Sequence, residues 1–344
     1  MTMKRMFLAA TALLIAGHVQ ADPVADFYKD KKVTLYVGYS AGGGYDVYGR
    51  QLARYYGKYL PGSPTVVVQN MPGAGSVRLA NWLYNVGAKD GTVLGTVARG
   101  VAFEPLFGAK GAQYDAVKFN WIGSMNDEVS VCVSWDKPNG VKKFDDVLSK
   151  ELVVGGTGGA ADTDQFPRVL NGIFGAKFRV VAGYPGGNDI NMALERGEVA
   201  GRCGRSWSSV LSTRAAWLKE KKVNVLVQLS LSKHEDLPNV PLVIDLAKND
   251  ADRAALKLVF ARQVMGRPFV APPGVPADRL AAMRKAFMET QKDKDFRLEA
   301  DKAKLEITPV SGEKVQAIVK ESYETPKDIV ARVAGLLLED KKGK

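Results

Sequence analysis

The fold of this chain is decided by the sequence VTLYVGYSAGGGYD, residues 33–46. Residues 33–37 are rich in β-branched and apolar side chains, which is typical of a buried strand. The glycines at 42–44 allow a tight turn, and apolar residues then recur at three- and four-residue spacing as far as residue 60, which predicts a helix that Asp46 helps to begin. A strand, a glycine loop and a helix in succession form the repeating unit of an α/β fold.

The same unit recurs along the chain. Further strands are predicted at residues 65–68, 92–97, 129–134, 151–155, 178–181 and 223–231. Glycine-rich loops are predicted at residues 72–75, 155–159 and 184–187. Helices are predicted at residues 76–84, near 144–148, from Asp162 or Thr163 onward, and at 189–196, 279–293 and 326–338. The pattern predicts two α/β lobes with a helical C-terminal part and a cleft between the lobes.

The first 21 residues predict an export signal. Lys4 and Arg5 precede an apolar run at residues 6–17, and Val19 and Ala21 occupy the positions that signal peptidase reads. The run is too short to span about 30 Å of hydrocarbon, which takes about 20 residues. We therefore expect cleavage after about Ala21 and export to the periplasm.

The length of the remaining chain predicts two lobes. About 320 residues exceed the size at which one hydrophobic core stops growing. We expect residues 22–125 and 232–344 to form the first lobe and residues 126–231 the second, in a monomeric protein.

The charge of the chain favours anionic partners. Lys and Arg number 48 against 37 Asp and Glu, so the net charge is +11, or +9 once Lys4 and Arg5 leave with the signal. The lysines lie in scattered short patches, and no motif that reads bases accompanies them. We therefore expect no nucleic-acid partner.

Cysteine and histidine are scarce, which excludes several kinds of site. His234 is the single histidine of the mature chain, so a multi-histidine zinc site is excluded, and we expect neither a metal nor a cofactor. His234 lies in a polar stretch where a solvated side chain is expected. Cys132 and Cys203 are compatible with one bridge in an oxidising compartment, although the apolar neighbours of Cys132 equally suit a buried thiol.

The glycine loops indicate an anion site. Each follows a predicted strand and precedes a predicted helix, so that backbone amides gather at helix N-termini. The glycines at 42–44 and at 73 and 75 fit neither the Walker pattern nor the dinucleotide-binding pattern. The loops therefore predict a shared anion pocket rather than a nucleotide site.

In this arrangement the sequence resembles the Bug receptors, the extracytoplasmic solute receptors of tripartite tricarboxylate transporters. The matching segments are SAGGGYD at 40–46, VVVQNMPGAG at 66–75, DGTVL at 90–94, GGTGG at 155–159, GYPGG at 183–187, PNVP at 238–241 and APPGVP at 271–276. They stand in the family's order and span nearly the whole mature chain. Tyr45 and Gln69 depart from the family pattern, as does the loop at residues 202–207.

The resemblance implies a two-lobed periplasmic-binding fold of the type II kind and a carboxylate ligand held between the lobes by hinge closure. It implies delivery of that acid to a two-component membrane permease. By position, the ligand-contacting residues would be Ser40, Ala41, Gly42, Gly43, Gly44, Tyr45 and Gly75 in the first lobe and Thr157, Gly158, Gly159, Ala160, Ala161, Tyr184, Gly186, Gly187 and Asn188 in the second.

Arginine side chains are further candidates, since a guanidinium can hold a carboxylate through two parallel hydrogen bonds. Arg202, Arg205 and Arg99 are the candidates for the pocket, Arg202 foremost, with surface ion pairing as the alternative. Together with Tyr45 and Tyr184 they favour a dicarboxylate or an aromatic acid.

Two other functions stay open. A periplasmic hydrolase or lyase would use paired carboxylates such as Asp162 and Asp164, although these also suit the first turn of a helix. A ligand-sensing receptor would share the fold and the ligand but serve a signalling partner. The receptor hypothesis needs no catalyst, and no persuasive nucleophile with its base is present.

Overall fold

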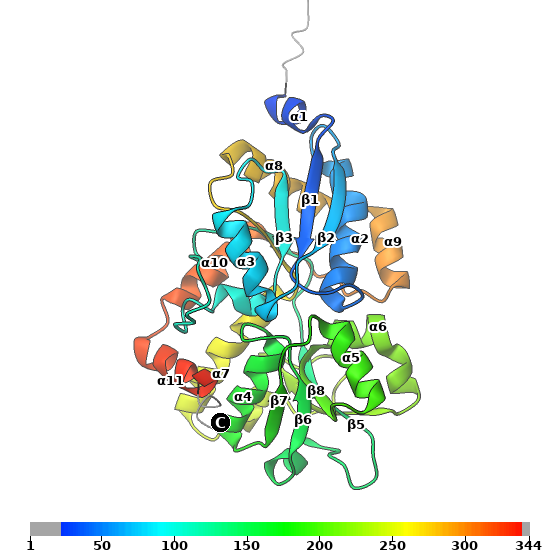
Figure 1. The fold of residues 1–344 in the computed structure, drawn as a ribbon, viewed down its shortest axis with the longest axis vertical. Coiled ribbons are helices and arrows are strands. Elements are labelled where there is room, and N and C mark those ends of the chain that lie inside the picture. Colours follow the sequence, from blue (N-terminus) through cyan, green and yellow to red (C-terminus); the bar gives the residue numbers. More distant parts are fainter. Residues whose placement is uncertain (1–21, 339–344) are drawn as a thin grey trace, which may run out of the picture.

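The computed structural model describes residues 22–338. These residues form two β-sheets, which lie one after the other along the long axis of the molecule (Figure 1). The predicted export signal, residues 1–21, lies outside the described residues. No helix within residues 22–338 has the length and apolar character that a membrane crossing requires.

The first sheet has six strands in the order β11-β4-β10-β3-β1-β2. Its strands are β1 (Lys32–Val37), β2 (Thr65–Asn70), β3 (Val93–Thr96), β4 (Asn120–Ser124), β10 (Pro268–Ala271) and β11 (Val310–Ser311). β1 pairs in parallel with β2 and β3, whereas β10 runs antiparallel to β3 and β4. The N-terminal strands therefore form an α/β unit that a late segment of the chain completes.

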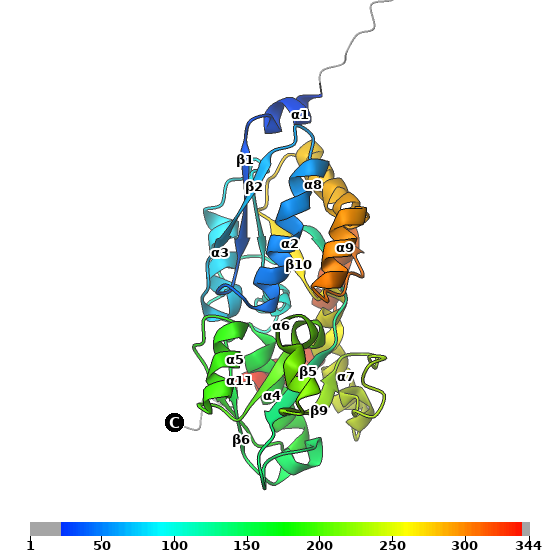
Figure 2. The ribbon, with the colours of Figure 1, turned by 90° about the vertical axis from the view of Figure 1, so that its right-hand side faces the viewer.

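Helices cover both faces of this sheet, with α3 on one side and α2, α8 and α9 on the other (Figure 2). Around this sheet lie α1 (Pro23–Tyr28), α2 (Gly44–Tyr59), α3 (Val77–Asn85), α8 (Ala277–Thr290), α9 (Lys294–Lys302) and α10 (Gly312–Tyr323). α2 shows why the predicted periodicity makes a helix, because Tyr48, Leu52 and Tyr56 share one face at four-residue spacing and are fully buried.

The second sheet has five strands in the order β7-β6-β8-β5-β9. Its strands are β5 (Ser130–Trp135), β6 (Leu152–Gly155), β7 (Phe178–Val181), β8 (Gly201–Ser206) and β9 (Val223–Leu229). The helices beside it are α4 (Asp162–Phe174), α5 (Gly187–Arg196), α6 (Trp207–Lys219), α7 (Asp250–Phe260) and α11 (Lys327–Leu338). β6 runs parallel to β7 and β8, and β5 runs antiparallel to β8 and β9.

The chain passes from the first sheet to the second at residues 125–129 and returns between β9 and β10. α7 and α11 belong to the C-terminal range that follows β9, yet α11 packs against both α4 and α7 (Figure 1). These two helices therefore lie against the second half of the molecule.

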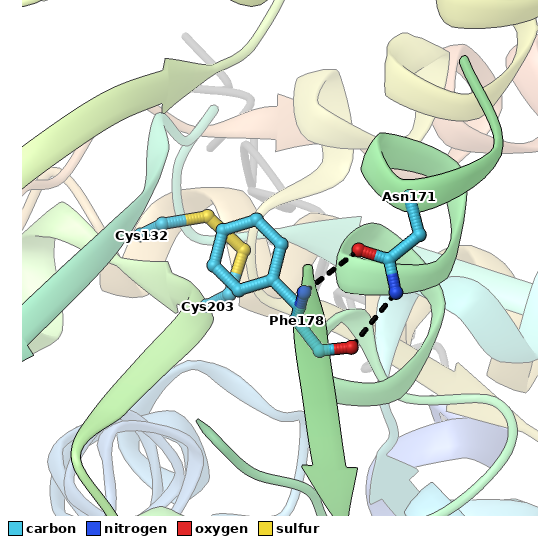
Figure 3. The surroundings of a disulfide bond; sticks show 4 residues. All are labelled: Cys132, Asn171, Phe178 and Cys203. Carbon is cyan, nitrogen blue, oxygen red and sulfur yellow. Dashed lines mark hydrogen bonds between the residues drawn. A yellow bond between two sulfur atoms is a disulfide. The ribbon is translucent and has the colours of Figure 1, made fainter. Parts of the chain in front are cut away.

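A disulfide joins Cys132 on β5 to Cys203 on the neighbouring strand β8 (Figure 3). The structure thus decides between the bridge and the buried thiol in favour of the bridge. Beside it, Asn171 of α4 donates to the carbonyl of Phe178 at 2.8 Å and accepts from its amide at 2.9 Å. These contacts tie α4 to the edge strand β7.

Candidate functional site

A small cavity of about 40 Å³ lies between the loops of the two sheets. Its wall consists of Tyr39, Gly43, Gly44, Tyr45, Ala98, Arg99, Thr157, Ala161, Asp162, Thr163, Gly187, Arg202, Gly204, Ser206 and Ser209. Two backbone hydrogen bonds join the two halves beside it: the Gly75 amide donates to the Thr157 carbonyl at 2.9 Å, and the Ser40 amide to the Pro185 carbonyl at 3.1 Å. The two halves are therefore closed around the cavity.

Four helices begin at this cavity: α2, α4, α5 and α6. Their N-cap residues are Gly43, Ala161, Gly186 and Ser206, and at none of the four does a side chain cap the helix by a hydrogen bond. The first turn of a helix carries unsatisfied amides and the positive end of the helix dipole. Four uncapped N-termini around one cavity make it favourable for a negative charge.

Two glycine loops, one from each half, pass very close to each other beside the cavity. Gly75 has φ +63°, and a β-carbon there would lie 2.7 Å from the amide nitrogen of Ala161. Gly158 has φ +127°, and its β-carbon would lie 2.6 Å from the carbonyl carbon of Ala74. Only glycine combines this left-handed backbone with this close approach. Gly75 and Gly158 therefore serve the contact between the two halves.

The first loop and the 184–187 turn are joined in a similar way. The Ser40 hydroxyl donates to Asp189 Oδ2 at 2.5 Å, and a β-carbon on Gly186 would lie 2.2 Å from Ser40 Oγ. Ser40 is one of the residues predicted to contact the ligand. In this structure its hydroxyl proton is engaged with the first turn of α5.

Arg202 is a buried cation at the cavity wall with no carboxylate partner among the described residues. It lies on β8, and its Nη1 donates to the Gly187 carbonyl at 2.9 Å and to Asn191 Oδ1 at 3.0 Å. Its Nε has no hydrogen-bond partner. Burial, together with the positive charges of Arg267 and Arg214, lowers the pKa of Arg202 to about 10. Within residues 22–338 this guanidinium therefore has no counterion.

Arg99, another of the predicted arginines, also lines the cavity but is paired. Its Nε lies 2.7 Å from Asp162 Oδ2, and its Nη2 donates to Ser206 Oγ at 2.7 Å. Asp162 also faces Arg262, whose Nη1 lies 3.7 Å from Asp162 Oδ1. The two guanidiniums therefore share one carboxylate.

The acids once considered for catalysis have structural partners. Asp164 accepts a hydrogen bond from the Gly158 amide at 2.8 Å, while burial raises the pKa of Asp164. Asp162 is engaged with two arginines. Both residues stand in the first turn of α4 and hold its loop and its cross-cavity contacts.

Arg267 lies behind the cavity wall and is fully buried. Its Nη2 is 3.2 Å from Glu128 Oε2, and its guanidinium carbon lies 4.8 Å and 4.9 Å from the ring centroids of Tyr45 and Tyr48. The guanidinium is therefore held by one ion pair and two aromatic faces. Nothing in the local sequence pattern around residue 267 pointed to this position.

Some of the predicted site residues meet at the cavity and others do not. Those at the wall are Gly43, Gly44, Tyr45, Arg99, Thr157, Ala161, Gly187 and Arg202. Those outside the wall are Ser40, Ala41, Gly42, Gly75, Gly158, Gly159, Ala160, Tyr184, Gly186 and Asn188. Sequence reasoning left Tyr39, Ser206 and Ser209 without a role, because isolated hydroxyl residues give no pattern that distinguishes a pocket from a surface.

His234 differs from its expected solvated position. Its side chain is 16% exposed, and its Nε2 lies 3.3 Å from Glu306 Oε1. Both residues border a second cavity of about 750 Å³ on the other side of Glu128. Within residues 22–338 no group of three or more His, Cys, Asp or Glu side chains is arranged to hold a metal ion.

Comparison with known proteins gives one short sequence match. No family model matches the chain. A protein of Cupriavidus necator, described as the UPF0065 protein in the gbd 5' region, is 41% identical over 90 residues. The match covers 26% of this chain and 27% of that protein, so the chain aligns with only about a quarter of its relative's length.

Comparison of structures covers nearly the whole chain. The periplasmic binding protein BugD superposes with a TM-score of 0.70 at 20% identity, over 91% of this chain and 99% of that chain. MatC of Rhodopseudomonas palustris, solved with bound malate, superposes with a TM-score of 0.69 at 18% identity, over 87% of this chain and 99% of that chain. The predicted α/β architecture is confirmed, and the chain has the two-lobed fold of the Bug-type periplasmic binding proteins.

Proposed function

We propose that this chain is a solute receptor of the Bug family, which closes on a small organic dicarboxylate in the periplasm and delivers it to a two-component membrane permease. The observation that carries the proposal is the buried guanidinium of Arg202. It faces a cavity ringed by four uncapped helix N-termini and has no counterion in the part of the chain that the structure describes. A buried charge without a partner is strongly unfavourable, so an anionic ligand that enters the cavity supplies what the protein lacks.

The charges at the wall favour an anion. Arg99 is paired with Asp162, so the charge of Arg202 is the one left unbalanced among the described residues of the wall. MatC, which shares the fold, was solved with malate, and this supports a dicarboxylate for the present chain. The uncapped amides provide directed donors for carboxylate oxygens.

The aromatic residues that once favoured an aromatic acid have other contacts. The ring of Tyr45 lies 4.9 Å from that of Tyr39, and its other neighbour is the guanidinium of Arg267. Tyr184 is not part of the wall. Neither ring is therefore free to stack on a ligand, which supports an aliphatic acid.

Hinge closure is proposed to occur about the two crossings at residues 125–129 and between β9 and β10. The first lobe would contain residues 22–125 and much of 232–344, and the second lobe residues 126–231. Because α11 packs against both α4 and α7, we propose that α7 and α11 move with the second lobe.

The test is a thermal-shift screen of the mature chain, residues 22–344, against L-malate, succinate, adipate, citrate and benzoate, with glucose and lysine as controls. A ligand that binds only the folded state raises the melting temperature with its concentration. Calorimetry then gives the affinity of each hit, and NMR of the bound acid over a day checks for turnover.

A shift with dicarboxylates and no product supports the receptor. A steady yield of product would instead support the hydrolase or lyase. Shifts with glucose or lysine alone would reject the carboxylate ligand. Transport is separated from sensing by deleting the gene and measuring uptake of the identified acid, since loss of uptake is expected only for the transport receptor.

A further inference from the structure

The hydroxyl of Ser206 accepts hydrogen bonds from two arginines at once. Arg99 Nη2 lies 2.7 Å from Ser206 Oγ, and Arg267 Nη1 lies 2.9 Å from the same oxygen. A serine hydroxyl has two acceptor lone pairs and one proton to donate. Both lone pairs are occupied, and no described residue accepts the proton of Ser206, which stands at the cavity wall.

Ser209, one turn further along α6, accepts a hydrogen bond from one of these arginines. Arg267 Nη2 donates to Ser209 Oγ at 2.8 Å, and no acceptor for the hydroxyl proton is found among the described residues. Ser209 also lines the cavity. A hydroxyl that accepts a hydrogen bond from a cation is polarised and becomes a stronger donor.

Ser208 lies between these two serines and provides the contrast. It receives the same kind of hydrogen bond, from Arg267 Nη2 at 2.9 Å. Its own proton, however, is donated to Glu128 Oε2 at 2.5 Å, and Ser208 is not part of the cavity wall. Arg267 therefore binds three serines but leaves only two hydroxyl protons free.

Arg267 is fixed to the first sheet while it binds α6 beside the second. Its amide donates to Ser124 Oγ at 2.9 Å, and its carbonyl accepts from the Met125 amide at 3.1 Å. Glu128 balances its charge at 3.2 Å. The guanidinium is therefore held in place before any ligand arrives, and it spans the closed interface between the two halves.

We propose that Arg267 is a positioning residue that orients and polarises the hydroxyls of Ser206 and Ser209, so that both donate to the anionic oxygens of the bound acid. This inference rests on the proposed function. It adds the hydroxyls of Ser206 and Ser209, at the start of α6, as hydrogen-bond donors to the ligand. Arg267 would raise the affinity for the ligand although it does not contact the ligand itself.

The test uses the mature chain and whichever of L-malate, succinate and adipate binds the wild-type protein most tightly. Calorimetry is carried out on the variants Ser206→Ala, Ser209→Ala, Ser208→Ala and Arg267→Lys, and on Arg267→Lys combined with Ser209→Ala. Thermal unfolding of each free variant monitors the fold. Ser209→Ala is decisive if Ser206→Ala fails to fold, because Ser206 also satisfies Arg99.

Loss of one hydrogen bond to a charged ligand weakens binding about 10- to 100-fold, and we expect this for Ser206→Ala and Ser209→Ala. Ser208→Ala should stay within about threefold of wild type, because it removes no ligand donor. In the Arg267→Lys background, Ser209→Ala should have a much smaller effect than in the wild type, since its hydroxyl is no longer oriented.

Wild-type affinity in a folded Ser209→Ala variant would overturn the inference, as would an equal loss in Ser208→Ala or additive effects of Arg267→Lys and Ser209→Ala. If the wild-type protein binds none of the acids, the proposed function itself fails, and this inference fails with it.

Discussion

Replacement of Arg202 by methionine should make the ligand-free protein more stable and the ligand much weaker. Methionine is unbranched and apolar, so it replaces the aliphatic stem of the arginine without its charge. The two opposite effects follow from one fact, that the Arg202 guanidinium is buried at the cavity wall with no carboxylate beside it among the described residues.

The stability effect is worked from the pKa of Arg202. Burial lowers this pKa to about 10, well below the ordinary value of an arginine, and the difference corresponds to about 3 kcal/mol against the charged form. The pKa is depressed, so this destabilisation is fully present at pH 7 and is relieved only as the pH rises above 10. Methionine removes it, but leaves the Gly187 carbonyl and Asn191 Oδ1 without their donor, at about 1 kcal/mol each. We expect a net gain of about 1 kcal/mol, or about 1–2 °C in melting temperature for a mature chain of about 320 residues.

The affinity effect has the opposite sign. Two hydrogen bonds from a guanidinium to a carboxylate contribute about 3 kcal/mol, so the dissociation constant should rise about 100-fold. The assays are differential scanning calorimetry of the free proteins and titration calorimetry with the dicarboxylate. Arg205→Met is the matched control, because Arg205 is fully buried against the Trp217 ring at 4.8 Å and does not line the cavity. Unchanged affinity in Arg202→Met, or an equal loss in Arg205→Met, would refute the reasoning.

Three further predictions concern closure, titration and the disulfide. Gly44→Ala should block closure and weaken ligand binding more than tenfold, because its β-carbon would lie 2.0 Å from the hydroxyl of Ser209 on α6. Gly159→Ala is the control, since its β-carbon would meet nothing within 4 Å and it should bind as wild type; small-angle scattering with saturating ligand should show that only Gly44→Ala stays less compact. Burial raises the pKa of Glu306 from 4.5 to about 7, so the charged carboxylate destabilises the folded state as the pH rises from 4.5 through 7. The variant Glu306→Gln should therefore have a higher melting temperature than wild type at pH 8 and the same melting temperature at pH 4.5. Reduction of the Cys132–Cys203 bridge, which closes a loop of 71 residues, should lower the free energy of unfolding by about 4 kcal/mol. Dithiothreitol should not change the free energy of unfolding of the control, in which both cysteines are replaced by alanine.

The repeated strand, glycine loop and helix units could be predicted because each is local. α2 begins at Gly44, two residues before the predicted start, since the extended backbone of Gly43 already ends the turn. α4 begins at Asp162, one of the two predicted positions. The spacing of apolar residues shows which face of a helix or strand is buried, without knowledge of the element it packs against. This is enough to predict the sequence of strands and helices in an α/β fold.

β8 could not be predicted, because Gly201–Ser206 contains two glycines and two arginines and yet is buried at every position. Arginine is rarely found inside a strand that is buried on both faces. Here Arg202 and Arg205 are accommodated by an amide side chain, main-chain carbonyls and the Trp217 ring. These partners are supplied by other elements and only after folding, so no local pattern reveals the strand.

The part of the candidate site that the glycine loops form could be predicted from the sequence. Glycines after strands point to helix N-termini, and Gly43, Gly44 and Gly187 do lie at the cavity. Side chains were harder, because their role depends on pairing. Arg99 and Arg202 looked alike in sequence, yet Arg99 is paired with Asp162, whereas Arg202 has no counterion among the residues described.

This difference in pairing connects closure with ligand binding. Arg99 extends from the first half of the molecule and meets Asp162 of the second, so its charge is balanced by the protein itself when the halves close. Arg202, the other arginine of the cavity wall, gains no such partner among the described residues. Closure without a ligand therefore buries an unbalanced charge, whereas closure around a carboxylate balances it. If the lobes open and close as proposed, the ligand's anion should shift the equilibrium towards the closed form, because its stabilising contact with Arg202 is complete only there.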